Sequence, residues 1–152
     1  MQIDDTDRRI LRQLMAEPEL AVGDLATRAG VTAATAWRRL GKLTEAGILR
    51  GQHAVIDWRA LGWAVEVSLR FTLDKTNPRA FDEFLEAARQ VPEVIEIQTF
   101  LGRVDLRLNV IARDMGHYQQ IYRDKILTLP HIADIEALML VSTIKDSGNL
   151  PL

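Results

Sequence analysis

One segment restricts the fold of this chain more than any other: residues 63–73 place an apolar side chain at every second position. Successive side chains of a β-strand point to opposite faces of the sheet, so strict alternation is typical of a strand with one buried face. The pattern therefore predicts a strand whose core-facing side chains are Trp63, Val65, Val67, Leu69, Phe71 and Leu73.

Downstream of this strand the apolar period changes between that of a helix and that of a strand. Apolar positions three and four residues apart indicate one helix between Asn77 and Pro92 and another between Asp114 and Pro130. Three further segments have the pattern of strands: 94–101, 106–112 and 132–144. The order β-α-β-β-α-β predicts a ferredoxin-like fold.

The two helices of such a fold can cover only one face of the four-stranded sheet, so the other face should be polar or be buried by another molecule. The last predicted strand is apolar on both sides, with Ile135, Ala137, Met139 and Val141 on one side and Leu138, Leu140 and Ile144 on the other. Soluble monomers seldom expose a large apolar face, so we expect the open face to pack against that of a second copy.

The first fifty residues follow the helical period instead. Their apolar positions predict helices over 4–16 and 22–29 and a third helix extending to residue 46. Gly30 suits a left-handed helix end, and Thr32 is a good N-cap for the third helix. Three helices with a glycine-containing turn before the last predict a helix-turn-helix unit, of the winged type.

The third helix carries the predicted DNA-binding surface. Small residues at its start let the backbone approach DNA closely, and basic residues follow within two turns. Residues 33–50 hold four Lys or Arg against one Asp or Glu, although the whole chain has a net charge of −2. Salt limits the reach of remote carboxylates to about 10 Å, so this local charge is sufficient to attract phosphates. We expect DNA contacts from Thr32, Ala33, Ala34, Thr35, Trp37, Arg38, Arg39 and Lys42.

Two alternatives apply to this helix. Its polar residues could form only the solvated face of a small helical bundle, because exposed Arg and Lys are common. Trp37 could stack on DNA, or it could shield the junction between helices.

These patterns predict an α+β chain in four parts. A helix-turn-helix domain spans residues 1–50, and a linker with a short strand at 54–56 spans 51–62. The ferredoxin-like domain spans 63–145, and a polar tail spans 146–152.

Composition excludes several classes of protein. The chain has no cysteine, which excludes disulfides and thiolate catalysis. No apolar run reaches the roughly 18 residues of a membrane span, and the N-terminus lacks the pattern of a signal peptide, so we expect a cytoplasmic protein. His53, His117 and His131 show no short ligand spacing. We therefore expect no catalytic residue, no metal site, no cofactor and no membrane partner.

Three segments of the first domain resemble the Lrp/AsnC family, the leucine-responsive or feast-famine transcriptional regulators. They are Ile3-Asp4-Asp5-Thr6-Asp7-Arg8-Arg9-Ile10-Leu11, Leu25-Ala26-Thr27-Arg28-Ala29-Gly30-Val31-Thr32, and residues 35–49 with the sequence TAWRRLGKLTEAGIL. The resemblance continues through Gly102–Asp105 and extends over nearly the whole chain.

The resemblance implies a mode of action. The third helix would recognise double-stranded DNA, and the C-terminal domains would form a homodimer, which in this family often gathers into octamers. A small-molecule effector, an amino acid or a related metabolite, would bind between C-terminal domains and change assembly or DNA affinity.

The family's effector loop usually reads Gly-Asp-aromatic-Asp, and here it reads Gly102-Arg103-Val104-Asp105. The resemblance implies that these four residues bind the effector. Asp105 could accept a hydrogen bond from an amino group, while Arg103 suits a carboxylate. The alternative is that Gly102 only supplies a positive φ angle within a surface turn.

The leading hypothesis is thus a sequence-specific transcriptional regulator and not an enzyme. Some relatives of this fold are tetrapyrrole (sirohaem) decarboxylases, which handle substrate carboxylates with histidine and arginine. This chain keeps a basic recognition helix, which such an enzyme need not retain, and its histidines are scattered. A third hypothesis is a co-regulator that acts only in hetero-oligomers.

Overall fold

The computed structural model describes residues 2–52, 54–146 and 150–152, so His53 and part of the predicted tail lie outside it. The chain divides into two compact units, Met1–Val55 with Lys145–Leu152, and Ile56–Ile144. The end of the tail, predicted as a separate part, thus belongs to the first unit. There Arg12 Nε donates a hydrogen bond of 2.8 Å to the carbonyl oxygen of Leu152.

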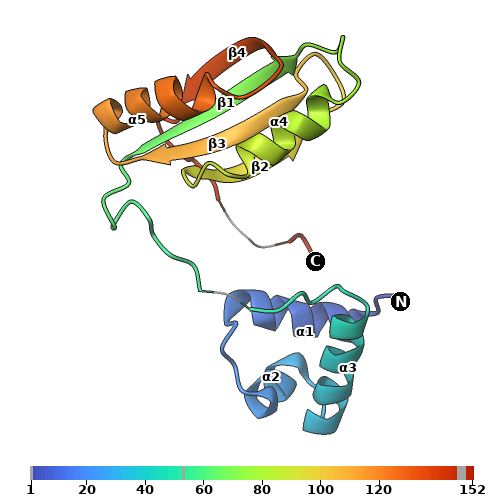
Figure 1. Cartoon of the computed structure of the whole chain (residues 1–152). Coiled ribbons are helices and arrows are strands. Elements are labelled where there is room, and N and C mark those ends of the chain that lie inside the picture. Colours follow the sequence, from blue (N-terminus) through green and yellow to red (C-terminus); the bar gives the residue numbers. More distant parts are fainter. Residues whose placement is uncertain (1, 53, 147–149) are drawn as a thin grey trace. The chain divides into compact units, whose positions relative to one another are not determined.

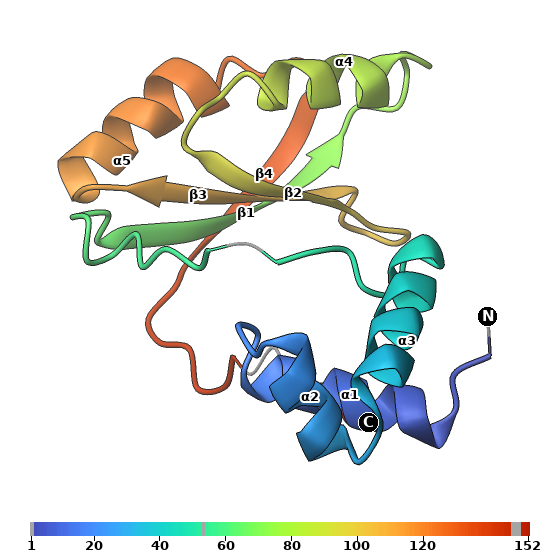
Figure 2. The ribbon, with the colours of Figure 1, turned by 90° about the horizontal axis from the view of Figure 1, so that it is seen from below.

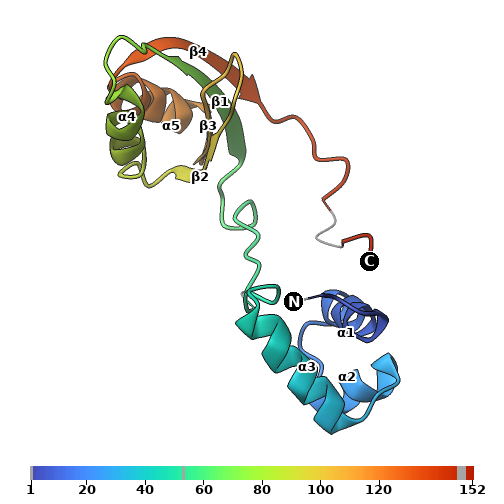
Figure 3. The ribbon, with the colours of Figure 1, turned by 90° about the vertical axis from the view of Figure 1, so that its right-hand side faces the viewer.

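Three helices build the first unit: α1 (Asp5–Ala16), α2 (Val22–Ala29) and α3 (Ala33–Glu45). Figure 3 shows α3 running obliquely past the other two. Their apolar stripes meet in a small core that contains Ile10, Leu25, Ala29 and Leu43. The three predicted helices are confirmed, and their bounds differ from the prediction by no more than one residue.

The turn between α2 and α3 is fixed by local hydrogen bonds. Gly30 has a φ of +68°, a left-handed conformation that ends α2 at little steric cost. Val31 N–H then donates to the carbonyl of Ala26, and the Thr32 side chain accepts a hydrogen bond from Thr35 N–H. These contacts set the direction in which α3 leaves the turn.

The second unit contains one antiparallel sheet of four strands in the order β2-β3-β1-β4 (Figure 1). Its elements follow the predicted β-α-β-β-α-β order, which confirms the ferredoxin-like fold. They are β1 (Val65–Leu73), α4 (Ala80–Ala88), β2 (Val94–Thr99), β3 (Leu106–Ala112), α5 (Met115–Ile121) with its π-helical continuation η1 (Tyr122–Ile126), and β4 (Ile132–Met139).

Both helices of this unit cover the same face of the sheet (Figure 2). The predicted alternation of β1 is confirmed, because Val67, Leu69 and Phe71 are almost fully buried on that face. The rings of Phe71 and Phe84 meet at 5.0 Å between centroids, which joins β1 to α4. This layer of buried side chains is the core of the second unit.

The open face of the sheet is mainly polar, so the prediction of an apolar open face is wrong for the central strands. There β1 and β3 present Glu66, Ser68, Arg70, Thr72, Arg107 and Asn109. The expectation came from the last strand, which lies at the edge of the sheet and represents the central strands poorly. Exposed apolar side chains do gather at the end of β4, at Leu138, Met139 and Leu140.

Two smaller expectations also differ from the structure. The last strand ends at Met139 and not at residue 144. The N–H of Leu140 still donates to the carbonyl of Glu66. Because β1 begins at Val65, the residues after Leu140 have almost no residue of β1 left to pair with. The short strand predicted at 54–56 does not form within the described part of the linker.

None of the helices in the described ranges is both long and apolar enough to cross a membrane.

The two phenylalanines of α4 allow a test of the core. Phe84 is fully buried, whereas Phe81 is 40 % exposed. We expect Phe84→Ala to lower the free energy of unfolding by about 3–5 kcal/mol, because the cavity left behind cannot fully close. Phe81→Ala should cost clearly less. Urea denaturation followed by circular dichroism would measure both, and equal losses would contradict this packing.

Candidate DNA-binding surface and effector pocket

The exposed residues of α3 lie along one stripe of the helix. Side chains three or four positions apart occupy the same face of a helix. The exposed pairs recur at that interval: Ala33 and Ala34, Trp37 and Arg38, Gly41 and Lys42. Trp37 is 70 % exposed, which argues against its shielding a junction between helices. The stripe thus combines small residues, an aromatic ring and two cations.

The two threonines at the start of α3 have a structural task. Thr32 Oγ1 accepts a hydrogen bond from Thr35 N–H at 3.2 Å and donates one to Thr35 Oγ1 at 3.0 Å. This cap satisfies a backbone donor that the first turn of a helix otherwise leaves free. The hydroxyl hydrogen of Thr35 is not used in this pair and can donate to another group.

Arg39 differs from the other cations of α3, because its guanidinium turns toward α1. Arg39 Nη1 lies 2.7 Å from a carboxylate oxygen of Asp4 and 3.2 Å from one of Asp7. Asp7 is completely buried, and a buried carboxylate needs charge partners and hydrogen-bond donors. We call Asp4, Asp7 and Arg39 the acid–arginine clamp.

The clamp is built on the first turn of α1. Asp7 N–H donates to Asp4 Oδ1 at 2.9 Å, and Asp4 N–H donates to Asp7 Oδ2 at 3.1 Å, which makes a capping box. The hydrogen bond from Asp7 N–H, together with the side chain of Arg39, lowers the pKa of Asp4. The clamp therefore ties the start of α1 to the middle of α3.

Not all the residues predicted for DNA binding thus share one surface. The structure brings together Ala33, Ala34, Trp37, Arg38 and Lys42, whereas Arg39 is 25 % exposed and bound to α1. This pairing could not be predicted, because local spacing does not identify a partner 32 residues from Asp7. The two aspartates three residues apart indicate a helix start, but not which cation they bind.

The loop between β2 and β3 contains the four residues predicted to bind an effector. Gly102 has a φ of +155°, a conformation that L side chains rarely adopt. Thr72 Oγ1 donates to the carbonyl of Arg103 at 3.2 Å, and Asp105 N–H donates to the carbonyl of Phe71 at 2.9 Å. The loop backbone is thus fastened to β1 at two neighbouring residues.

Asp105 points away from the open face and is held by its own protein. It is 7 % exposed and accepts a hydrogen bond of 2.9 Å from Leu73 N–H, while Lys75 Nζ lies 2.8 Å away. Burial alone would raise the pKa of Asp105, but these two donors outweigh it and lower the pKa. A cavity of about 250 Å³ adjoins this pair at the start of α4.

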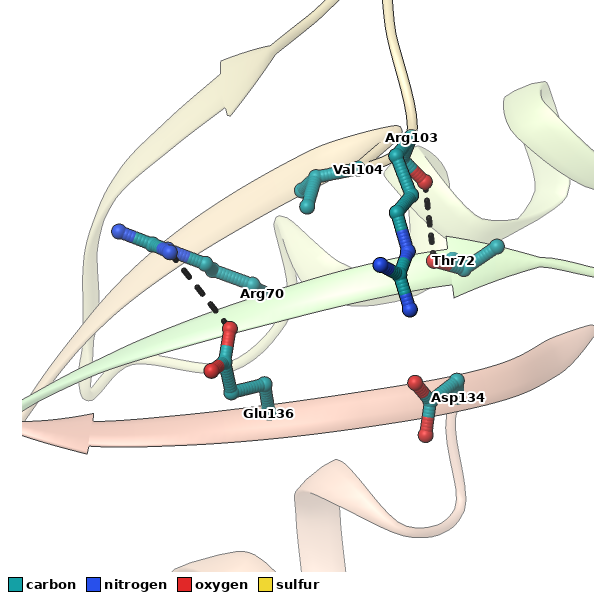
Figure 4. A pocket seen from close by; sticks show the side chains of 6 residues that line it. All are labelled: Arg70, Thr72, Arg103, Val104, Asp134 and Glu136. Carbon is teal, nitrogen blue, oxygen red and sulfur yellow. Dashed lines mark hydrogen bonds and ion pairs between the residues drawn. The ribbon is translucent and has the colours of Figure 1, made fainter.

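Arg103 and Val104 face a different cavity, on the open face of the sheet. It has a volume of about 420 Å³, and its other walls are Arg70, Thr72, Asp134 and Glu136. Figure 4 shows the Arg103 side chain descending from the loop over β1, with Arg70 and Glu136 side by side at the other end. Arg70 and Glu136 form an ion pair of 3.5 Å.

The four loop residues predicted to bind an effector do not line one common cavity of this chain. Arg103 and Val104 belong to the cavity on the open face, and Asp105 belongs to the cavity beside α4. Gly102 lines neither cavity and provides the turn between them. The amino-group acceptor expected at Asp105 is already occupied by the ammonium group of Lys75.

Comparison with known proteins follows the same division of the chain. Residues 66–150 match the model of the Lrp/AsnC ligand-binding domain, which is more than half of the chain. The chain belongs to the Lrp/AsnC family. Residues 3–50 match a winged helix-turn-helix DNA-binding domain. This member of the family thus joins a DNA-binding domain to a ligand-binding domain, the composition of a transcriptional regulator.

Several similar proteins have names that describe regulators. The proline dehydrogenase transcriptional activator of Rhodobacter capsulatus is 29 % identical over 147 residues, which cover 97 % of this chain and 96 % of that protein. The transcriptional regulator AzlB of Bacillus subtilis is 28 % identical over 152 residues, covering 100 % of this chain and 97 % of that protein.

Solved structures of similar proteins cover nearly the whole chain. An AsnC family transcriptional regulator from Agrobacterium tumefaciens is 31 % identical, with a TM-score of 0.87 and coverage of 98 % of this chain and 97 % of the other. A Neisseria meningitidis transcriptional regulator, solved as a complex with L-Met, is 25 % identical, with a TM-score of 0.89 and coverage of 99 % and 97 %.

The environment of Asp105 predicts a pH dependence of stability. A carboxyl whose pKa is lowered by folding stabilises the protein above its unfolded pKa of about 4, and this contribution is lost as the pH falls through the folded pKa. We expect wild type to exceed Asp105→Asn in free energy of unfolding near neutral pH, with a difference that shrinks below about pH 4.

Urea titrations at several pH values would measure this difference. Lys75→Met removes the ammonium but leaves the hydrogen bond from Leu73. In a protein that carries Lys75→Met, the further substitution Asp105→Asn should therefore lower the free energy of unfolding by less than it does in the wild type, but not by zero. A difference that did not change with pH would show that Asp105 acts through its shape and not through its charge.

Proposed function

We propose that this regulator binds DNA by inserting α3 into the major groove, and that an amino acid or related metabolite bound to its C-terminal domain modulates that binding. The observation that carries the proposal is the exposed stripe of α3, in which Arg38 and Lys42 lie on one face beside the small residues Ala33 and Ala34. Small residues permit close approach to DNA, and the two cations suit phosphate or guanine.

Within this surface we assign the residues two kinds of role. Arg38 and Lys42 contact DNA directly, Trp37 stacks on sugar or base, and the Thr35 hydroxyl supplies a hydrogen bond near the helix start. Arg39 is a positioning residue, because the acid–arginine clamp occupies its guanidinium and holds α3 against α1.

The effector part of the proposal is supported by the match to a ligand-binding domain and by the L-Met complex of the Neisseria relative. The cavity beside Arg103 offers charged groups of both signs, which suits an amino acid. We propose no enzymatic activity, since the similar proteins are named regulators and the chain keeps a basic recognition helix. Sirohaem decarboxylation can be checked by adding sirohaem and following its absorption spectrum.

We also propose that the chain forms homodimers or larger homo-oligomers through the open side of the sheet. The exposed apolar side chains at the end of β4 support this assembly, since Leu138 lies opposite Ser68 of the open face and is 38 % exposed, and Leu140 beyond it is 36 % exposed. Helix-turn-helix dimers place two recognition helices on half-sites separated by about one helical turn of DNA.

Replacement of Arg38 tests the DNA-binding surface. We expect Arg38→Ala to weaken DNA binding about tenfold or more and to lower the slope of log affinity against log salt by about 1, without loss of thermal stability. Fluorescence anisotropy with DNA from upstream of the chain's own gene would measure both quantities. Arg79→Ala, an exposed arginine of the other unit, is the matched control.

Arg39→Ala separates positioning from contact, because it should lower both the unfolding temperature and the DNA affinity. Unchanged DNA affinity in Arg38→Ala would contradict the assignment of α3. Failure of the wild type to bind any DNA as a homo-oligomer, with binding restored by a paralogue, would favour a co-regulator.

The assembly is tested by size-exclusion chromatography with light scattering at micromolar concentration. We expect a mass of at least two chains for the wild type. Leu138→Lys should shift the protein toward the monomer, because a charge in an apolar interface is costly to bury. Leu127→Lys, at an exposed apolar position elsewhere in the unit, is the control. A monomeric wild type would contradict the proposed assembly.

A further inference from the structure

A glycine stands in the interior of α3. Gly41 lies four residues before Glu45, the last residue of this helix. A glycine inside a helix makes the helix less stable than an alanine would, because its backbone loses more conformational freedom on folding. The sequence thus accepts a loss of stability at this position, and the structure should show what the glycine provides in return.

The first unit itself does not require a glycine at this position. Gly30 and Gly47 have a left-handed backbone, each with a φ of +68°, whereas Gly41 has the ordinary conformation of a helix. A Cβ atom added at Gly41 would meet no other atom within 4 Å among the described residues. Alanine would therefore fit here without strain and without a clash inside the unit.

Gly41 lies on the exposed stripe of α3. It follows Trp37 by four positions and Arg38 by three, so the three residues share one face of the helix. A helical side chain covers the turn that precedes it, so a side chain at position 41 would cover part of the turn that carries Trp37 and Arg38. With a hydrogen atom in its place, the backbone of α3 is accessible beside these two residues.

We propose that Gly41 is the point at which the backbone of α3 comes closest to DNA. A glycine lets a ligand approach the backbone to a distance that a Cβ atom would prevent. The partner is DNA because the cations Arg38 and Lys42 share this stripe and residues 3–50 match a helix-turn-helix domain. This inference rests on the proposed function and adds a residue that determines specificity.

The approach distance decides which groups of the DNA the helix can reach. Phosphates lie along the edges of the major groove, whereas the base edges that carry sequence information form its floor. A side chain at position 41 would hold α3 away from the floor. Contacts with base edges would then be lost, while long cations such as Lys42 could still reach phosphates.

Gly41→Ala tests the proposal through two effects of opposite sign. Alanine favours the helix, so the melting temperature of the first unit, followed by circular dichroism, should rise by about 4–8 °C. The affinity for DNA from upstream of the chain's own gene should fall about tenfold, because the methyl group occupies space that the DNA needs. Gly41→Leu should weaken binding further. Unchanged affinity in both variants would overturn the proposal.

Three controls separate close approach from an effect of helix stability or charge. In Gly41→Ala the affinity for a scrambled DNA fragment of equal length should fall much less, and the dependence on salt should stay that of the wild type, because no charge is removed. Gly23→Ala, at an exposed glycine of α2 with open space around it, should raise the melting temperature without loss of affinity. An equal loss on both DNA fragments, or an equal loss in Gly23→Ala, would contradict the role of Gly41.

Arg38→Ala measured on the same DNA keeps this inference separate from the proposed function. If Arg38→Ala weakens binding and Gly41→Ala does not, the close approach at Gly41 is wrong and the DNA-binding role of α3 stands. If neither substitution weakens binding, both assignments are wrong.

Discussion

Everything in the second unit depends on the covering of its sheet from one side. Since α4 and α5 pack on the same face, the apolar side chains of β1 and β3 point that way, and the alternate side chains must suit a surface without helices. This surface carries ion pairs where the opposite face carries apolar side chains: Arg70 pairs with Glu136, and Arg107 pairs with Glu96. The polar, charged character of this face is thus a consequence of how the strands and helices alternate along the sequence.

The first unit has a small apolar core, and a buried ion pair adds to the contacts that hold its three helices together. A fully buried carboxylate, Asp7, is tolerated because one arginine of α3 and the backbone of α1 satisfy it. Breaking such a pair by removal of one partner is costly, so Arg39 helps to hold α3 in the direction that the turn before it sets. One of the three cations of the expected DNA surface therefore acts inside the protein.

Local periodicity in the sequence was sufficient to predict the element order, the alternation of β1 and the helix-turn-helix. These features arise within one helix or strand, where spacing alone determines which side chains share a face. Three features depend on contacts between residues far apart in the sequence and could not be predicted. They are the ion pair of Arg39 with Asp7, the position of Arg70 opposite Arg107 on the neighbouring strand β3, and the ion pair of Asp105 with Lys75. The apolar open face was wrongly expected because one edge strand stood for the whole sheet.

The loop between β2 and β3 links the two sides of the unit through a very short stretch of chain. Two peptide bonds separate Arg103, above the polar face, from Asp105, which is anchored beside α4. Both residues are also fastened to consecutive positions of β1, Thr72 and Phe71. The loop is therefore a short covalent connection between the two sides of the sheet, and this connection does not run through the tightly packed core.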